Sequence, residues 1–290
     1  MPHIIEMGRN SQAVLVTGSA KGIGAAVTQR LVELGFFVYA GVRRDEDAAT
    51  WRSLSATAVQ AVLLDVSDEA SIASAARQIQ ATLGARQLAG LVNNAGIAVA
   101  GPLEFLPIRE LRRQLEVNVI GQIAVTQAML PMLRTARGRI VNIGSISGRS
   151  ALPLTGAYAA SKFALEALTD ALRVELMPAG IEVSIVEPGV IATPIWETSL
   201  KSADVMMREM PKAAFDYYGR IIDAVRNRAV SGGTTGLPPR VVADAVAHAL
   251  TARRPRTRYL VGRDARLRML FQRLPDRVRD RIIARRLAKL

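Results

Sequence analysis

A tyrosine and a lysine in the stretch GAYAASKFALEAL, Tyr158 and Lys162, have types and spacing that could move a proton. Four residues apart on a helix, the two side chains lie on one face, one turn from each other. That face continues with leucines, so Lys162 stands where an apolar residue is expected. Because a buried ammonium is costly, either this end of the helix faces solvent or the charge has a function. A nearby ammonium would lower the pKa of Tyr158 from the ordinary value of about 10 towards a working range.

Three glycines form a second group. Gly18, Gly22 and Gly24 follow the apolar run AVLVTG, and a helical pattern opens at the last of them. Glycines at such a turn bring backbone N–H groups at a helix start close to a pyrophosphate. A tight strand-to-helix turn also needs glycine for its own sake, and the spacing is not that of the most familiar dinucleotide-binding pattern. The glycines by themselves leave both interpretations open.

The elements that must position these residues alternate along the chain. Near-continuous apolar runs separated by helical patterns predict a parallel sheet covered on both faces, a doubly wound α/β domain of the Rossmann type with seven strands. We expect this single domain to span 1–264, with a helical insertion at about 195–236, and a basic amphipathic helical tail to follow at 265–290. The expected strands are 13–18, 36–42, 59–66, 88–96, 139–145, 181–189 and 257–262.

The composition removes several kinds of chemistry. The 290 residues include no cysteine, which excludes disulfides, thiolate catalysis and cysteine-bound metal. With two histidines only, His3 and His248, we expect neither a metal site nor a Ser/His/Asp triad. The start of the chain lacks the pattern of a signal peptide, and no apolar run is long enough to span a membrane. We therefore expect a cytoplasmic protein.

The sequence resembles the short-chain dehydrogenase/reductase family over roughly residues 12–265. The family pattern TGxxxGIG matches Thr17 to Gly24, and NNAG and a PG motif follow in register. Tyr158 and Lys162 match the family's YxxxK pair. The resemblance implies a catalytic tetrad of Asn118, Ser145, Tyr158 and Lys162. It implies that Ser145 holds the substrate oxygen, Tyr158 exchanges its proton, Lys162 binds the nicotinamide ribose and Asn118 supports a water link to the lysine. It also implies cofactor contacts from Gly18, Gly22, Ile23, Gly24, Asp65, Val66, Asn93, Ala95, Gly96, Tyr158, Lys162, Pro188, Gly189, Ile191 and Thr193.

Charge decides which nicotinamide cofactor is expected. An acidic residue at the end of the second strand would bind a ribose 2′-hydroxyl and repel a 2′-phosphate. Here that strand ends in Val42, Arg43 and Arg44, and Lys21 lies in the glycine turn. Because cations bind phosphate through charge-assisted hydrogen bonds, Lys21 and Arg43 favour NADP(H) over NAD(H).

The insertion points to the substrate class. Flexible methionines and flat aromatic rings suit a bulky apolar ligand, or else they pack the insertion onto the domain. Several stretches look most like the retinol and hydroxysteroid dehydrogenase branch, so we expect a lipophilic alcohol, ketone or aldehyde. A 3-ketoacyl thioester reductase is the alternative enzyme, and a non-catalytic NADP(H)-sensing module is the alternative of another class. The residues concerned are Trp196, Met206, Met207, Met210, Phe215, Tyr217 and Tyr218.

The formal net charge of +13 is concentrated after Arg253. An apolar stripe of Leu267, Leu270, Phe271 and Leu274 runs between the arginines of the tail. The stripe would pack over the substrate opening or on a neighbouring subunit, or it would lie on an anionic membrane surface. No nucleic-acid recognition motif accompanies the charge. The family resemblance implies a homo-dimer or tetramer.

Overall fold

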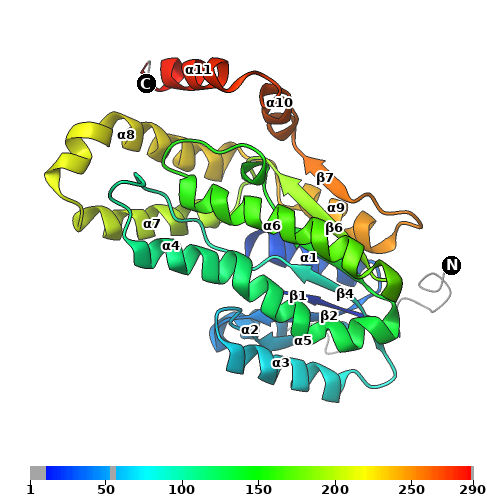
Figure 1. The fold of residues 1–290 in the computed structure, drawn as a ribbon. Coiled ribbons are helices and arrows are strands. Elements are labelled where there is room, and N and C mark those ends of the chain that lie inside the picture. The colour runs from blue at the N-terminus through cyan, green and yellow to red at the C-terminus, as the bar shows by residue number, and fades with distance from the viewer. Residues whose placement is uncertain (1–10, 53–56, 289–290) are drawn as a thin grey trace.

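The computed structural model describes residues 11–52 and 57–288, so His3 lies outside the described residues. Seven parallel strands form one sheet in the order β3-β2-β1-β4-β5-β6-β7, which confirms the predicted doubly wound architecture (Figure 1). The strands are β1 Gln12–Val16, β2 Phe37–Val42, β3 Val59–Leu63, β4 Gln87–Asn93, β5 Arg139–Ile143, β6 Glu182–Pro188 and β7 Arg258–Val261.

The strands are apolar throughout because both faces of the sheet are covered. In β1, Val14 and Val16 belong to one core cluster, whereas Ala13 and Leu15 belong to the other, and all four are fully buried. Alternate residues of a strand point to opposite faces, so a sheet with two cores needs an unbroken apolar run.

Helices form a layer on each face. The first core packs against α1 Gly22–Glu33, α2 Asp45–Arg52 and α9 Arg240–Thr251. The second packs against α3 Glu69–Thr82 and α5 Gly121–Ala136, and the end of α6 reaches it through Leu172. Helix α4 spans Ile108–Leu115, a π-helical turn at Glu116–Ile120 joins it to α5, and α6 spans Gly156–Glu175.

The strand order reverses between β1 and β4, and this reversal places a crevice at the carboxyl ends of the strands. The predicted insertion consists of α7 Ile195–Arg208 and α8 Lys212–Thr235, which pack against each other beside this edge (Figure 1). Every predicted strand and the insertion therefore occur where the sequence pattern indicated.

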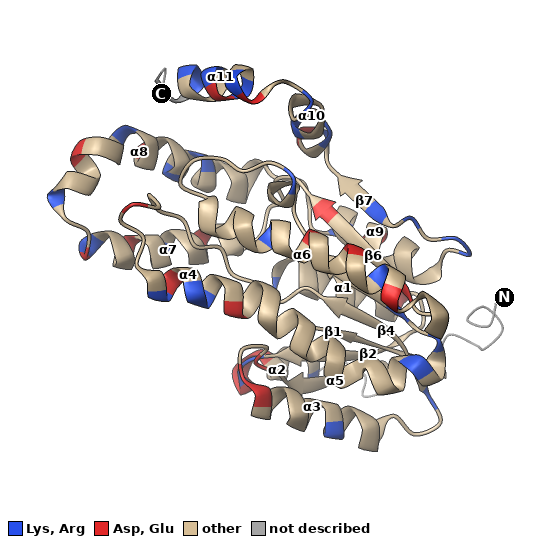
Figure 2. Ribbon diagram, in the orientation of Figure 1, with Lys and Arg blue, Asp and Glu red and all other residues tan. Residues whose placement is uncertain are grey.

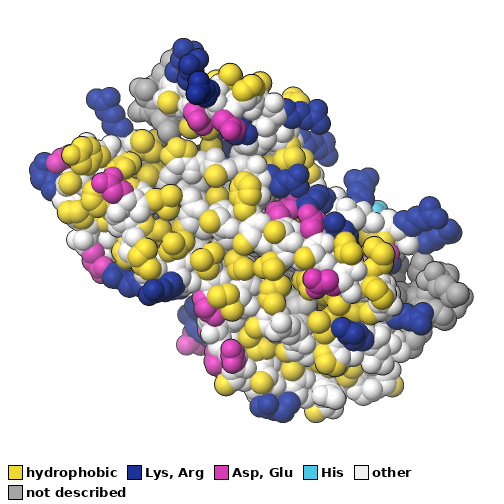
Figure 3. All heavy atoms as spheres, in the orientation of Figure 1, with side chains coloured by type: hydrophobic (Ala, Val, Ile, Leu, Met, Phe, Trp, Pro, Cys, Tyr) yellow, Lys and Arg dark blue, Asp and Glu magenta, His cyan; other side chains and the backbone are white. Residues whose placement is uncertain are grey.

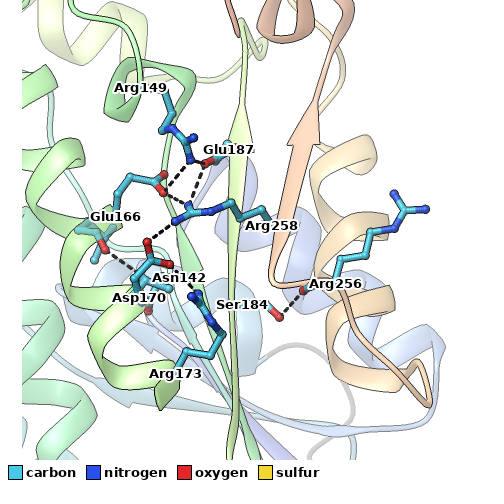
Figure 4. A network of polar contacts seen from close by, with 11 residues as sticks. Asn142, Arg149, Glu166, Asp170, Arg173, Ser184, Glu187, Arg256 and Arg258 are labelled. Carbon is cyan, nitrogen blue, oxygen red and sulfur yellow. Dashed lines mark hydrogen bonds and ion pairs between the residues drawn. The ribbon is translucent and has the colours of Figure 1, made fainter. Parts of the chain in front are cut away.

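The C-terminal edge of the sheet is tied to α6 by a cluster of charges (Figure 4). Arg258 on β7 forms ion pairs with Glu166 and Asp170 of α6 and with Glu187 of β6. Arg149 also contacts Glu187, at 3.3 Å. Burial and the neighbouring charge of Glu187 raise the pKa of Glu166 to about 7. This cluster holds the last strand against the helix that carries Tyr158.

The tail forms α10 Arg263–Phe271 and α11 Asp276–Ala288, on which Lys and Arg gather in Figure 2. Its apolar stripe does not form a buried face, because Leu267 and Leu270 are 67% and 60% exposed. Helix α10 instead contacts the 3-10 turn Ile146–Gly148, and α11 contacts α8. In the part of the chain that the structure describes, no helix combines the length and apolar character needed to cross a membrane.

Candidate active site

A cavity of about 700 Å³ runs along the carboxyl ends of the strands, from the glycine turn to the insertion. It brings together most of the residues selected from the sequence, across seven separate segments of the chain. Asn93, Gly24 and Asn118 do not line it. The predicted residues that do are Gly18, Lys21, Gly22, Ile23, Arg43, Asp65, Val66, Ala95, Gly96, Ser145, Tyr158, Lys162, Pro188, Gly189, Ile191 and Thr193.

The glycine turn has the backbone that a pyrophosphate site needs. Gly18 and Gly22 have φ values of +66° and +61°, which residues with a side chain rarely adopt. The amide of Asn94 donates to the carbonyl oxygens of Thr17 and Gly18, at 2.9 and 3.1 Å, and holds the turn in shape. No side chain caps the start of α1 and no acidic residue lies in its first turn, so its N-terminal N–H groups suit an anion.

Gly24 has a packing role in this structure. A Cβ atom at Gly24 would overlap the carbonyl oxygen of Gly18, because the first turn of α1 lies directly against the loop. Gly24 thus lets the helix start where the turn ends, although its own atoms do not line the cavity.

Asn93 is likewise buried behind the site. Its amide donates to Thr126 and to Asn142, at 2.9 Å each, and so joins β4 to α5 and β5. The neighbouring residues Ala95 and Gly96 are the ones that reach the cavity. Asn94, which the sequence analysis did not single out, lines the cavity as well.

Cations line the cavity near the end of β2. Arg43 and Lys21 face it, and among the described residues neither forms an ion pair. Arg44 is instead held by Asp47, with two hydrogen bonds of 3.0 and 3.1 Å. Asp47, which sequence reasoning missed, lines the same cavity. The hydrogen bond from Arg44 lowers the pKa of Asp47, as do the charges of Lys21 and Arg43.

Lys162 lies inside the protein and not at a solvent-facing helix end. Its side chain is 4% exposed, and Nζ donates to the carbonyl oxygen of Ile143 at 2.8 Å. Burial lowers the pKa of Lys162 to about 8, and the carboxylate of Glu166 on the next turn acts in the opposite direction. The odd lysine in the leucine stripe is therefore a buried cation that faces the cavity.

Tyr158 differs in one respect from the sequence expectation. Burial raises the pKa of its hydroxyl, whereas a hydrogen bond with Ser145 and the charge of Arg268 act to lower it. Lys162 Nζ lies 5.8 Å from the centre of the tyrosine ring and is bonded to Ile143. Desolvation thus outweighs the nearby charges, so the Tyr158 hydroxyl keeps its proton at neutral pH.

Asn118 occupies the π-helical turn, a departure from regular helix that is frequent at functional sites. It is fully buried, and its side chain bonds both backbone groups of Ile97, at 2.9 and 3.0 Å. A third bond reaches the hydroxyl of Ser161. In this structure Asn118 therefore positions the Ile97 segment, which lines the cavity, and the hydrogen bond of Lys162 goes to Ile143 and not to Asn118.

The methionines and aromatic residues of the insertion divide between both expected roles. Trp196 and Met207 line the cavity, together with Leu152, Ile222 and Val225. Met206 and Met210 are packed in a separate small core. Phe215 and Tyr217 are exposed, and Tyr218 donates to Glu104. One wall of the cavity is thus apolar, but most of the predicted residues do not form it.

Two further cavity residues were not singled out from the sequence. Arg228 projects from α8, and Arg268 projects from α10, in the tail. The periodicity of the tail drew attention to its leucines, whereas it is an arginine between them that reaches the cavity. Only the path of the chain after β7 reveals this.

A doubly wound domain with this turn and this tyrosine–lysine pair defines an oxidoreductase of the dinucleotide-binding class. The model of the short chain dehydrogenase family matches residues 12–204, and the chain belongs to that family.

Several curated relatives lie near the retinol and hydroxysteroid branch. Retinol dehydrogenase 5 of Mus musculus is 37% identical over 284 residues, covering 93% of this chain and 87% of the relative. 17-beta-hydroxysteroid dehydrogenase type 6 of Homo sapiens is 38% identical over 280 residues, covering 94% and 87%. An NADPH-dependent 3-dehydrocapnine reductase of Ornithobacterium rhinotracheale is 34% identical, covering 95% and 97%.

Solved structures share the fold along nearly the whole chain. A short chain dehydrogenase from Burkholderia cenocepacia, in complex with NADP, has a TM-score of 0.69 and 28% identity, covering 95% of this chain and 96% of that one. One from Burkholderia phymatum, in complex with NAD, has a TM-score of 0.75 and 25% identity, covering 92% and 94%. Relatives of similar fold thus bind either cofactor.

Proposed function

We propose that this protein is an NADP(H)-dependent oxidoreductase that interconverts a lipophilic ketone or aldehyde and the corresponding alcohol. The observation that carries the proposal is the meeting of Ser145, Tyr158 and Lys162 in one cavity that also contains the glycine turn and its cations. The intact set of groups for proton transfer argues against a non-catalytic binding module.

The residues present fit a nicotinamide dinucleotide. The uncapped start of α1 would hold the pyrophosphate, Lys162 would hold the nicotinamide ribose, and Asp65 and Val66 would lie at the adenine, since all of these residues line the cavity or its edge. When bound, the nicotinamide supplies a hydride to the carbonyl carbon or accepts one from the carbinol carbon.

Two side chains of the protein bind and protonate the substrate oxygen. The Ser145 hydroxyl hydrogen-bonds this oxygen and orients it towards Tyr158. In reduction, the Tyr158 hydroxyl donates its proton to the oxygen as the electron pair of the carbonyl bond moves onto it. The raised pKa of Tyr158 suits this direction, because the hydroxyl is protonated at neutral pH.

The preference for NADP(H) is supported by Lys21 and Arg43, two cations that face the cavity. A phosphate on the adenosine ribose would be attracted by both cations, and the charges of Lys21 and Arg43 also act on Asp47, an acidic residue that lines the cavity. The pairing of Asp47 with Arg44 offsets its charge. The apolar wall of Trp196, Met207 and Val225 supports a lipophilic substrate.

The test follows NADPH and NADH oxidation with a panel of retinoid, steroid and aliphatic carbonyl compounds and an acetoacetyl thioester. Tyr158→Phe keeps the ring but removes the proton, so we expect turnover to fall at least ~100-fold while NADPH binding persists. A preference for the thioester would assign the protein to 3-ketoacyl thioester reduction. Equal NADPH binding without turnover by either protein would favour the binding module.

We also propose that the protein assembles as a homo-dimer or tetramer. Exposed apolar side chains on α6, Phe163 and Val174, support pairing of two chains through this helix; Figure 3 shows apolar side chains spread over the face on which α6 lies. The exposed leucines of α10 support contact with a neighbouring subunit or a membrane surface. We expect the enzyme in the cytoplasm.

A further inference from the structure

The substrate end of the cavity carries an unbalanced positive charge. The acidic residues that line the cavity, among those described, are Asp47 and Asp65, and both belong to the nucleotide end. Four arginines line it elsewhere, from α4, α8 and α10: Arg113, Arg226, Arg228 and Arg268.

Two of these arginines are already neutralised. Arg113 pairs with Glu110 at 2.7 Å, and Arg226 pairs with Asp204. These pairs account for their positions without any ligand.

Arg228 and Arg268 have no such partner. Within the described part of the chain, Arg228 makes no hydrogen bond or ion pair. Arg268 donates from Nη2 to the carbonyl oxygen of Ser150, but its Nε is buried and has no hydrogen-bond acceptor among the described residues. The carboxylate of Asp264 acts on Arg268 from a distance, and its Oδ2 accepts a hydrogen bond from the backbone N–H of Val190 at 2.8 Å.

The side chains of Arg228 and Arg268 line the same cavity as Tyr158. Burial and the positive charge of Arg228 lower the pKa of Arg268 to about 10. The charge of Arg268 in turn acts on the hydroxyl of Tyr158. The buried Nε–H of Arg268 without an acceptor is unfavourable, and the positive charge of Arg228 adds to that cost, so a bound anion is the simplest way to complete this arrangement.

We infer that Arg228 and Arg268 bind an anionic head group of the substrate, so that the enzyme acts on an acidic carbonyl compound with an apolar chain. This inference rests on the proposed function and narrows its substrate. Arginine suits carboxylate and phosphate because its planar donors bond two oxygens at once. The apolar wall of Trp196, Met207, Ile222 and Val225 would hold the chain beside the charged group.

Binding without turnover is the first test, with NADP⁺-saturated protein and two probes. A medium-chain fatty acid should bind about tenfold more tightly than its methyl ester, because hydrogen bonds to charged groups are the stronger ones. Arg228→Gln should remove this difference without weakening NADP⁺ binding. Because Arg228 is exposed and makes no hydrogen bond or ion pair within the described residues, its replacement is not expected to disturb folding. Arg268→Gln and the charge-preserving Arg268→Lys form the second pair of variants.

The matched controls are arginines on the same helices that do not line the cavity. Arg220→Gln on α8 and Arg266→Gln on α10 should keep the preference for the acid. A loss of NADP⁺ affinity in Arg228→Gln, or equal binding of acid and ester by the wild type, would overturn the inference.

Turnover separates this inference from the proposed function. The substrates are a medium-chain γ-keto acid, its methyl ester and the phosphate monoester of a long-chain hydroxy ketone, and the relative rates of acid and phosphate identify the head group. If Tyr158-dependent turnover is equal for acid and ester, the function stands and the anion site falls. If nothing turns over but acid binding depends on Arg228, the anion site stands and the function falls.

Discussion

At the scale of single residues, the site depends on where charge is buried. Lys162 is a cation without a carboxylate in direct contact, held by the carbonyl oxygen of Ile143. Burial therefore brings its pKa down to about 8, from an ordinary value near 10.5. Below that pH the side chain is charged and above it is neutral, so the charge available to a bound ribose depends on pH within an accessible range.

We predict that NADPH affinity falls as pH rises through about 8. Loss of the proton on Lys162 removes a charged hydrogen bond, which we expect to weaken binding by about tenfold. Nucleotide fluorescence titrations between neutral and mildly alkaline pH measure this change in NADPH affinity. Lys162→Met should bind weakly at every pH and show no such transition; an equally steep transition in that variant would assign the effect to another group.

At the scale of elements, the strand-to-helix turn brings the nucleotide site close to the first helix. Gly18 and Gly22 supply conformations with positive φ, and Gly24 supplies space. The amide of Asn94 closes the turn from the neighbouring strand end. Because β1 and β4 are adjacent and mark the reversal of strand order, the loops after both reach the same crevice.

The Gly24→Ala substitution should test whether Gly24 is needed for the space that its missing side chain leaves, as distinct from its backbone conformation. The added methyl group must displace the loop backbone, so we expect a loss of about 1–3 kcal/mol in the free energy of unfolding and weaker nucleotide binding. The matched control is Gly219→Ala in α8, where a Cβ would meet no atom within 4 Å. That variant should gain about 0.5–1 kcal/mol from helix propensity. Urea denaturation measures the free energy of unfolding of both variants. An unchanged value for Gly24→Ala would contradict the packing argument.

At the scale of the whole molecule, charge ties the last strand to the catalytic helix (Figure 4). Arg258 reaches three carboxylates, and Glu166 and Glu187 among them are nearly inaccessible, at 8% and 3% side-chain exposure. The pKa of Glu166 is raised to about 7, so the folded protein holds its proton more tightly than an unfolded chain would. The stability contributed by this raised pKa is present at low pH and is lost as pH rises through about 7.

Arg258→Met should therefore destabilise the protein more at pH 8 than at pH 5. At the higher pH it leaves the ionised carboxylates of Glu166 and Glu187 with Arg149 as the remaining cation of the cluster, at 3.8 and 3.3 Å. Because one cation remains, we expect a cost of about 3 kcal/mol, the lower end for a broken buried ion pair. At the lower pH Glu166 is protonated and the loss is smaller. Urea denaturation at both values measures the difference, with Arg256→Met as the control because that side chain is exposed on the same segment. An equal loss of unfolding free energy at both pH values would show that the contribution of Arg258 does not depend on the protonation of Glu166.

The sequence by itself determined the sheet, its helical layers, the glycine turn and the Tyr158–Lys162 pair. Apolar periodicity and local backbone requirements are properties of short segments, so they can be recognised in the sequence without knowledge of the fold. The roles of Gly24, Asn93 and Asn118 were assigned by motif, and the structure places all three behind the cavity wall, where hydrogen bonds and close packing define them.

Only the tertiary structure decided the rest of the cavity. The insertion contributes Trp196 and Met207, whereas Met206, one residue away, is buried elsewhere. Burial rather than the neighbouring cation sets the direction of the Tyr158 pKa shift. Arg228 and Arg268 are far apart in sequence and line one cavity only because α8 and α10 both reach it. Such features depend on segments that are distant in the sequence and packed together in the fold. No local sequence pattern encodes the electrostatic environment that these segments create.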